Sequence, residues 1–323
     1  MLQITPPTLD GMRSESTNLN SALGGIDNFN NNSELWDKYD LRYILEIYEI
    51  VKSDTDARIS DTPIYKRQIE TQDRYDNNGI KFQMQVVPNR TYIFAIWADF
   101  VDEGTTSDLF YNTSNLRAIS RQRDYAHTAM EEALDAYHIC STQTIKSAAT
   151  LNLTLTRPMA KLRVVALDYG EISNYSTPTN ISVTFDTANN PIYKSFNAVT
   201  SEISDECPAH EYNYSVNPMP YQEYSGTTTA GQQVSGFVLF SDYLFTPRDI
   251  IADERNEYPV SFSMNIIYEN NPEINHNIDF DTQIPLSRNY LTTVVSNCLT
   301  QSECFIVKID DTLLSGEEIT NNN

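Results

Sequence analysis

The sequence is poor in the residues on which most metal sites depend. Its 323 residues include four cysteines and four histidines, and neither kind is clustered at the spacing of a zinc site. The four histidines are scattered along the chain, as His127, His138, His210 and His276. We therefore expect no metal site and interpret each histidine as a surface or packing residue.

Motifs of the common enzyme classes are also missing. The chain has no H-E-x-x-H, G-x-S-x-G, G-x-x-x-x-G-K-[ST] or G-x-G-x-x-G, which removes the usual support for zinc proteases, α/β-hydrolases, P-loop proteins and dinucleotide-binding enzymes. Paired carboxylates remain an alternative, because glycoside hydrolases set them by distance in space and not along the chain. We predict a non-enzymatic protein without a cofactor, with a hydrolase as a distant alternative.

Basic residues are scarce. The chain carries 22 Lys and Arg against 44 Asp and Glu, for a formal charge of -22. Residues 161–323 hold only 7 of the basic residues and 22 of the acidic ones. The negative electrostatic potential of such a chain repels nucleic acids and anionic lipid surfaces, so neither is expected as a partner.

Long apolar runs are absent as well. No stretch reaches the roughly 18 residues of a membrane-spanning helix, and Met1-Leu2-Gln3 does not begin a signal peptide. We expect either a cytosolic protein or a chain whose removed leader preceded this numbering.

The most informative feature that is present is a repeat. Residues 80–96 and 278–294 share the pattern I-x-F-x-x-Q-[VI]-x-x-x-R-x-Y-[IL]-x-x-[IV], and Ile-Tyr-Glu at 47–49 recurs at 267–269. Within each copy, alternating apolar residues, a polar break and a second apolar run predict a strand, a turn and another strand, hence a hairpin. Arg90, Tyr92, Arg288 and Tyr290 are interpreted as structural residues of the repeat core, each tyrosine acting as a tyrosine corner. The repeat predicts two similar domains, with chance similarity between two hairpins as the alternative.

Strand signals dominate the rest of the chain. We expect a flexible leader over residues 1–35, an N-terminal β-sandwich domain over 36–158 and a C-terminal one over 159–323. Residues 92–98 are apolar enough for a central buried strand. One helix is expected near 124–138, where Tyr125, Ala129, Ala133 and Tyr137 recur at spacings of four.

Two groups of residues are candidates for specific roles. Residues 187–232 read as one long loop whose tyrosines form a candidate binding surface: Tyr193, Tyr212, Tyr214, Tyr221 and Tyr224. Cys298 and Cys304 flank a short link between two expected strands, where a disulfide could form in an oxidising compartment. Two free buried thiols are the alternative.

Four motifs occur in order along the chain: YIFAIWADFVD at 92–102, LFYNT at 109–113, LTRPMAKL at 155–162 and IPLSRNYLTT at 284–293. Together they resemble the fimbrillin-like surface proteins of Bacteroidales, particularly their anchor-type subunits. The resemblance implies an all-β protein with two tandem transthyretin-like, Greek-key β-sandwich domains. It also implies an exported protein, lipid-anchored as a precursor, at the outer-membrane surface or in a fimbrium, with a role in pilus assembly or adhesion.

Subunits of such pili join by β-strand addition, which implies other fimbrial subunits as partners, with surface glycans or proteins as further partners. The segment after Ile309 is a poor donor strand, because only Leu313, Leu314 and Ile319 are apolar among acidic and polar residues. We therefore expect an anchor, tip or accessory subunit. A carbohydrate-binding surface lipoprotein that uses the tyrosines of 187–232 is the alternative.

Overall fold

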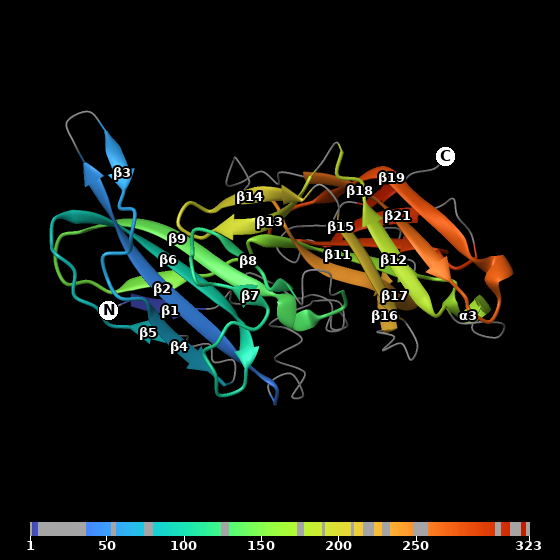
Figure 1. The fold of residues 1–323 in the computed structure, drawn as a ribbon, viewed down its shortest axis with the longest axis horizontal. Helices are drawn as coiled ribbons and strands as arrows, with labels where there is room; N and C mark the ends of the chain where they lie inside the picture. The colour runs from blue at the N-terminus through green and yellow to red at the C-terminus, as the bar shows by residue number, and fades with distance from the viewer. Residues whose placement is uncertain are drawn as a thin grey trace.

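Nearly all regular structure in the chain is β-structure, as expected from the sequence. The computed structural model describes residues 2–5, 37–52, 56–73, 80–123, 129–172, 178–188, 191–207, 210–215, 223–227, 233–247, 258–300, 305–310 and 318–320. The predicted all-β class is therefore confirmed (Figure 1). The division into two tandem domains with a boundary near residue 158 stays a prediction.

The N-terminal half is built around one apolar strand. Its strands are β1 (Leu2–Thr5), β2 (Tyr39–Lys52), β3 (Ala57–Ile59), β4 (Gln68–Gln72), β5 (Ile80–Phe82), β6 (Arg90–Asp102), β7 (Tyr111–Asn112), β8 (Ile119–Arg121), β9 (Ala136–Ile145) and β10 (Leu151–Thr154). A five-stranded sheet has the order β3-β2-β6-β9, with β4 also beside β2, and a three-stranded sheet has the order β10-β1-β5. Residues 92–101 of β6 are buried on both faces, which confirms the predicted central strand.

The C-terminal half adds a second core. Its strands are β11 (Met159–Ala166), β12 (Asn180–Phe185), β13 (Ile192–Asn197), β14 (Glu202–Cys207), β15 (His210–Ser215), β16 (Glu223–Thr227), β17 (Gln233–Phe245), β18 (Tyr258–Ile267), β19 (His276–Leu286), β20 (Leu291–Ser296), β21 (Phe305–Asp310) and β22 (Glu318–Thr320). A four-stranded sheet β15-β12-β18-β19 supplies Ile181, Val183, Phe262 and Phe280 to this core. Leu162 and Val164 of β11 face them from the large sheet.

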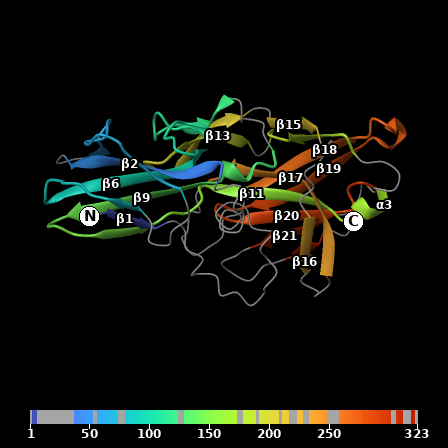
Figure 2. The same ribbon diagram turned by 90° about the horizontal axis from the view of Figure 1, so that it is seen from below.

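The largest sheet contains strands from both halves. Ten strands belong to it, eight of them in the order β22-β21-β20-β11-β17-β13-β8-β7, with β14 beside β13 and β16 beside β17. Strands β7 and β8 come from the N-terminal half. Strand β8 pairs with β13 through Ser195↔Ser120 and Phe196↔Ile119, and β7 pairs with β8. Figure 2 shows the layers of strands edge-on. The two halves therefore share one hydrogen-bonded sheet.

Two sequence expectations about loops were wrong in the described residues. Residues 2–5, expected within a flexible leader, form β1, whereas residues 6–36 lie outside the described residues. The expected loop 187–232 contains four strands, β13 to β16. The four strands were missed because prolines and charged residues, such as those in Glu-Ile-Ser-Asp-Glu-Cys of β14, masked the alternation.

The predicted helix near 124–138 was also wrong where it is described. Met130 has a φ of 64°, outside the helical range, a 3-10 turn spans only Glu132–Leu134, and β9 begins at Ala136. Residues 124–128 lie outside the described residues. The other helical segments described are α3 (Tyr169–Ile172) and the 3-10 turn η4 (Pro272–Ile274), and none of the described helices is long and apolar enough to cross a membrane.

Candidate functional site

The first copy of the repeat is a corner between two sheets and not the expected hairpin. Strand β5 pairs with β1, whereas β6 pairs with β2 and β9. Tyr92 at the start of β6 is buried, and its hydroxyl donates to the Val87 carbonyl oxygen at 2.8 Å. This is the contact expected of a tyrosine corner. Arg90 instead lies at the surface, where its half-exposed side chain pairs with Glu49 at 2.9 Å.

The second copy forms a corner with different side chains. Strand β19 pairs with β18, whereas β20 pairs with β11 and β21. The Thr292 hydroxyl donates at 2.7 Å to the carbonyl oxygen of Pro285, the position equivalent to Val87. Arg288 is buried and donates to the Thr246 and Ser201 carbonyl oxygens, and Tyr290 is half-buried. The two copies therefore share a turn between sheets, closed by a tyrosine in one and a threonine in the other.

Strand β1 is held on both of its backbone edges. It runs parallel to β10, from Leu2↔Leu151 to Thr5↔Thr154, and antiparallel to β5, with Leu2↔Phe82 and Ile4↔Ile80. A strand in this position closes a sheet that would otherwise have a gap one strand wide between β5 and β10. The segment before residue 6 thus completes the second layer of the N-terminal half (Figure 1).

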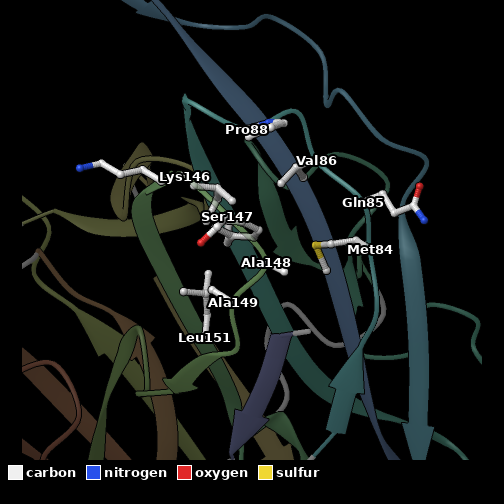
Figure 3. A pocket seen from close by; sticks show the side chains of 11 residues that line it. Met84, Gln85, Val86, Pro88, Lys146, Ser147, Ala148, Ala149 and Leu151 are labelled. Atoms are coloured by element: carbon white, nitrogen blue, oxygen red, sulfur yellow. The ribbon is translucent and has the colours of Figure 1, made fainter.

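A groove of about 460 Å³ lies at the start of β1. One wall is the segment 84–88 that follows β5, the other is the segment 145–151 that leads into β10, and Phe94 of β6 also lines it (Figure 3). The lining residues are Met84, Gln85, Val86, Pro88, Phe94, Ile145, Lys146, Ser147, Ala148, Ala149 and Leu151. Four of them, Met84, Val86, Ile145 and Leu151, are half-buried and pack against the core below.

The groove and the slot occupied by β1 form one continuous channel. Leu2 stands opposite Leu151, which lines the groove, and opposite Phe82, which lies two residues before the first lining residue of the other wall, Met84. The far end is closed by the Asn89 amide, which donates to the Ile145 carbonyl oxygen at 2.6 Å. An extended segment longer than β1 can therefore enter the space between the same two backbones, with apolar side chains on the half-buried wall residues.

Of the candidate binding-loop tyrosines, Tyr193 and Tyr224 have described side chains and lie on different strands, so the binding surface of all five stays a prediction. Tyr193 lies on β13 with its ring 6.0 Å from that of Tyr258, whereas Tyr224 on β16 is buried beneath the Arg163 guanidinium. Tyr212 and Tyr214 lie on β15, opposite Val183 and Ile181, and Tyr221 lies outside the described residues. Because Tyr224 is buried, its ring has no face free to stack on a sugar.

The cysteines form no reactive site that the structure describes. Cys298 is buried below the β20–β21 turn, and burial raises the pKa of its thiol to about 12. Cys304 lies outside the described residues, so the proposed disulfide stays a prediction. The Cys140 thiol donates to the Val199 carbonyl oxygen at 3.0 Å, and Cys207 is buried.

The remaining concentrations of charge are buried ion pairs. Arg42 contacts Asp99 at 2.7 Å and Asp108 at 2.9 Å, and Arg157 contacts Asp135 at 2.9 Å. Burial raises the pKa of Asp99 and of Asp135 despite the neighbouring guanidinium groups. Within the described ranges, no group of three or more His, Cys, Asp or Glu side chains could hold a metal ion. These pairs serve packing, whereas the groove has accessible apolar surface.

The groove was missed by reasoning from sequence, although part of its signal is present. Leu2 and Ile4 alternate with Gln3 and Thr5, but four residues are too short to predict a strand. The two walls are separated by about 60 residues, and only the fold brings them together.

Several solved structures from Bacteroides and Parabacteroides species are similar over most of their length. A candidate adhesin from Bacteroides thetaiotaomicron is 11% identical with a TM-score of 0.46, and the match covers 99% of this chain and 97% of that one. A candidate polysaccharide-binding protein from the same species is 10% identical (TM-score 0.42, 95% and 94% covered). A fimbrial assembly protein from Parabacteroides distasonis is 9% identical (TM-score 0.36, 99% and 97% covered). At these values, none of the similarities assigns a function.

No curated protein matches the chain. A protein-family model, in contrast, matches residues 5–322, which is nearly the whole sequence. The chain therefore belongs to DUF6562, a family of unknown function.

Proposed function

We propose that this protein is a non-enzymatic structural subunit of the bacterial cell surface that joins a partner by β-strand addition in the channel formed by β1 and the groove. The observation that carries the proposal is the placement of β1 between β5 and β10, with an apolar groove continuing past Leu2. Strand addition uses main-chain hydrogen bonds along a strand edge and pockets for alternate side chains. The backbones of β5 and β10 and the half-buried apolar residues of the groove are the groups proposed to supply them. The resemblance of the sequence to fimbrillin-like proteins supports the same role.

A peptide-binding experiment tests the channel. The Ile4→Pro substitution removes a backbone donor from the middle of β1 and weakens its pairing. A labelled peptide of about ten residues that repeats the Leu-Gln-Ile-Thr alternation of β1 should bind the Ile4→Pro chain and not the wild type, as followed by fluorescence anisotropy. The Ile4→Val chain is the control. Absence of binding to the Ile4→Pro chain contradicts the proposal.

Neighbouring valines supply a matched control for the groove. Val86 lines the groove, whereas Val87 next to it is 54% exposed. In the Ile4→Pro background, Val86→Asp should weaken peptide binding about tenfold or more, since it places a charge in an apolar channel, and Val87→Asp should leave it nearly unchanged. Equal effects of the two substitutions would show that the peptide binds elsewhere.

We also propose an anchor, tip or accessory position and not that of a repeating stalk subunit. The support is the acidic and polar composition of residues 310–323, which makes a poor donor strand. Purified full-length protein should remain monomeric as its concentration rises in sedimentation velocity. Assembly into filaments would refute this position.

Export to the cell surface with a lipid anchor on the precursor belongs to the same proposal. It is supported by the resemblance and is tested by fractionation of the native host after metabolic labelling with a fatty acid. Label in an outer-membrane form of the protein is the expected result. A glycan array tests the carbohydrate-binding alternative, for which we expect no specific signal.

A further inference from the structure

A hairpin from the C-terminal half completes the core of the N-terminal half. Strands β13 and β14 pair with each other, and β13 also pairs with β8 of the first half. Figure 1 shows this hairpin lying beside β8 and β9, and its start also pairs with β17 of its own half through Tyr193↔Phe245. Phe196 and Ala198 of the hairpin region belong to the same buried cluster as Trp97.

Phe196 is the centre of this contact. Its side chain is fully buried, with its ring 6.0 Å from Trp97, 4.7 Å from His138 and stacked at 5.8 Å on Phe245. The Arg288 guanidinium lies 5.4 Å from the same ring. Trp97 and His138 belong to the first half, whereas Phe196, Phe245 and Arg288 belong to the second. One aromatic cluster is therefore assembled from both.

Hydrogen bonds fix the residues that follow β13 to the first half. The Ala198 amide donates to the Leu116 carbonyl oxygen at 2.7 Å, and the Cys140 thiol donates to the Val199 carbonyl oxygen at 3.0 Å. Ser201, whose φ of 63° is unusual for a residue other than glycine, lies 3.0 Å from Nε2 of His138 through its hydroxyl. Such a strained residue persists only where its surroundings hold it firmly.

A second set of contacts joins the halves beside the hairpin, from β8 and the 3-10 turn region to β11 and β17. Lys161 donates to Glu132 at 2.6 Å, and Arg121 donates to Asp242 at 2.6 Å. The Met130 amide donates to the Ser241 carbonyl oxygen at 2.8 Å. The charged groups in these contacts are largely buried, so separating the halves would leave charges without their partners in an apolar region.

We propose that the two halves unfold as one cooperative unit and that the β13–β14 hairpin couples them. Unfolding of the second half would withdraw Phe196 and Phe245 from around Trp97 and open the first core. Unfolding of the first half would expose the same rings and leave β13 without β8. The inference is independent of the proposed strand addition, because the hairpin and the groove share no residue.

Hydrogen exchange of the full chain in increasing urea tests the coupling. Peptides that contain β6 report on the first core, and peptides that contain β18 report on the second. If the halves are coupled, both sets of amides lose protection at the same urea concentration. If the amides of β6 and of β18 lose protection at two different urea concentrations, the proposal is overturned. This experiment uses the unmodified chain and does not require a variant to fold.

Two phenylalanine substitutions give a sharper comparison. Phe196 stacks on Phe245 in the shared cluster, and Phe262 stacks on Phe280 at 4.6 Å within the second core. With coupling, Phe196→Ala and Phe262→Ala should each speed global exchange in both β6 and β18 by about a hundredfold or more. If Phe196→Ala speeds exchange only in β6, and Phe262→Ala speeds exchange only in β18, the two halves open independently. Phe196→Leu and Phe262→Leu serve the same comparison if an alanine variant does not fold.

Discussion

At the scale of single residues, a hydroxyl group closes each of the two corners. Tyr92 donates to the Val87 carbonyl oxygen and Thr292 to that of Pro285, so the same backbone position is held by different side chains. The repeated tyrosine in the sequence was therefore a guide to the turn and not to the group that fixes it. In the second copy the sequence pattern alone could not single out Thr292.

Removal of the Tyr92 hydroxyl tests the first corner. Tyr92→Phe keeps the buried ring and loses one hydrogen bond, so the free energy of unfolding should fall by about 0.5–1.5 kcal/mol. Urea unfolding measures it. Tyr65→Phe, at a side chain that is 39% exposed, is the control and should change stability by less than about 0.5 kcal/mol. An unchanged Tyr92→Phe variant would mean that the hydroxyl does not hold the turn.

Glu132 and Lys161 make the stability depend on pH. Burial alone would raise the pKa of Glu132, but the Lys161 ammonium with its hydrogen bonds outweighs burial and holds that pKa below its ordinary value. A carboxyl whose pKa is lower in the folded state stabilises the fold above its unfolded pKa of about 4.3. That contribution is lost as pH falls through the folded-state pKa.

In the Glu132→Gln variant, the free energy of unfolding should therefore fall less steeply as the pH is lowered into the acidic range. The variant should also lose about 3–5 kcal/mol at neutral pH, because the Lys161 ammonium stays buried without its counter-ion. Urea unfolding between neutral and acidic pH measures both effects. Glu49→Gln, which breaks the exposed pair with Arg90, is the control and should cost less than about 1 kcal/mol. If the free energy of unfolding of Glu132→Gln falls with pH as steeply as that of the wild type, Glu132 is not the source of the pH dependence.

At the scale of elements, the antiparallel pairing of β17 with β11 depends on a glycine. A Cβ atom at Gly236 would overlap the Ala166 carbonyl oxygen, close to the bulge between Val164 and Val165. Gly236→Ala should thus destabilise the protein by about 1–3 kcal/mol. Gly170→Ala in α3 meets no atom within 4 Å and should be neutral or slightly stabilising. Thermal unfolding of the two variants compares them, and equal stability would remove the steric argument.

The elements that could be predicted from the sequence are those with strong apolar alternation. Strand β6 was expected because residues 92–98 are continuously apolar, and β18 because Val260, Phe262, Met264 and Ile266 alternate. Strand β14 was missed, since an edge strand that exposes charged residues carries little alternation. The helix expected near 124–138 failed because alanine spacing could not reveal the positive φ of Met130. The groove depended on partners distant in the chain, which no local pattern reports.

At the scale of the whole molecule, the charge of -22 is the dominant long-range force. Self-repulsion keeps copies apart and strains the folded state, and salt screens both effects. The melting temperature should therefore rise from low to physiological ionic strength, as measured by differential scanning calorimetry. A melting temperature that falls with salt would mean that local ion pairs outweigh the net repulsion.

The main path of the large sheet ends in two of its shortest strands. Strand β7 has two residues and β22 has three. An exposed edge strand can pair with a strand of another molecule through its unpaired backbone N–H and C=O groups. Edge strands of two or three residues offer few such groups. Pairing between copies of the molecule through these two ends of the large sheet is therefore disfavoured. An assembly that grew by extending this sheet sideways would have almost no backbone length on which to form.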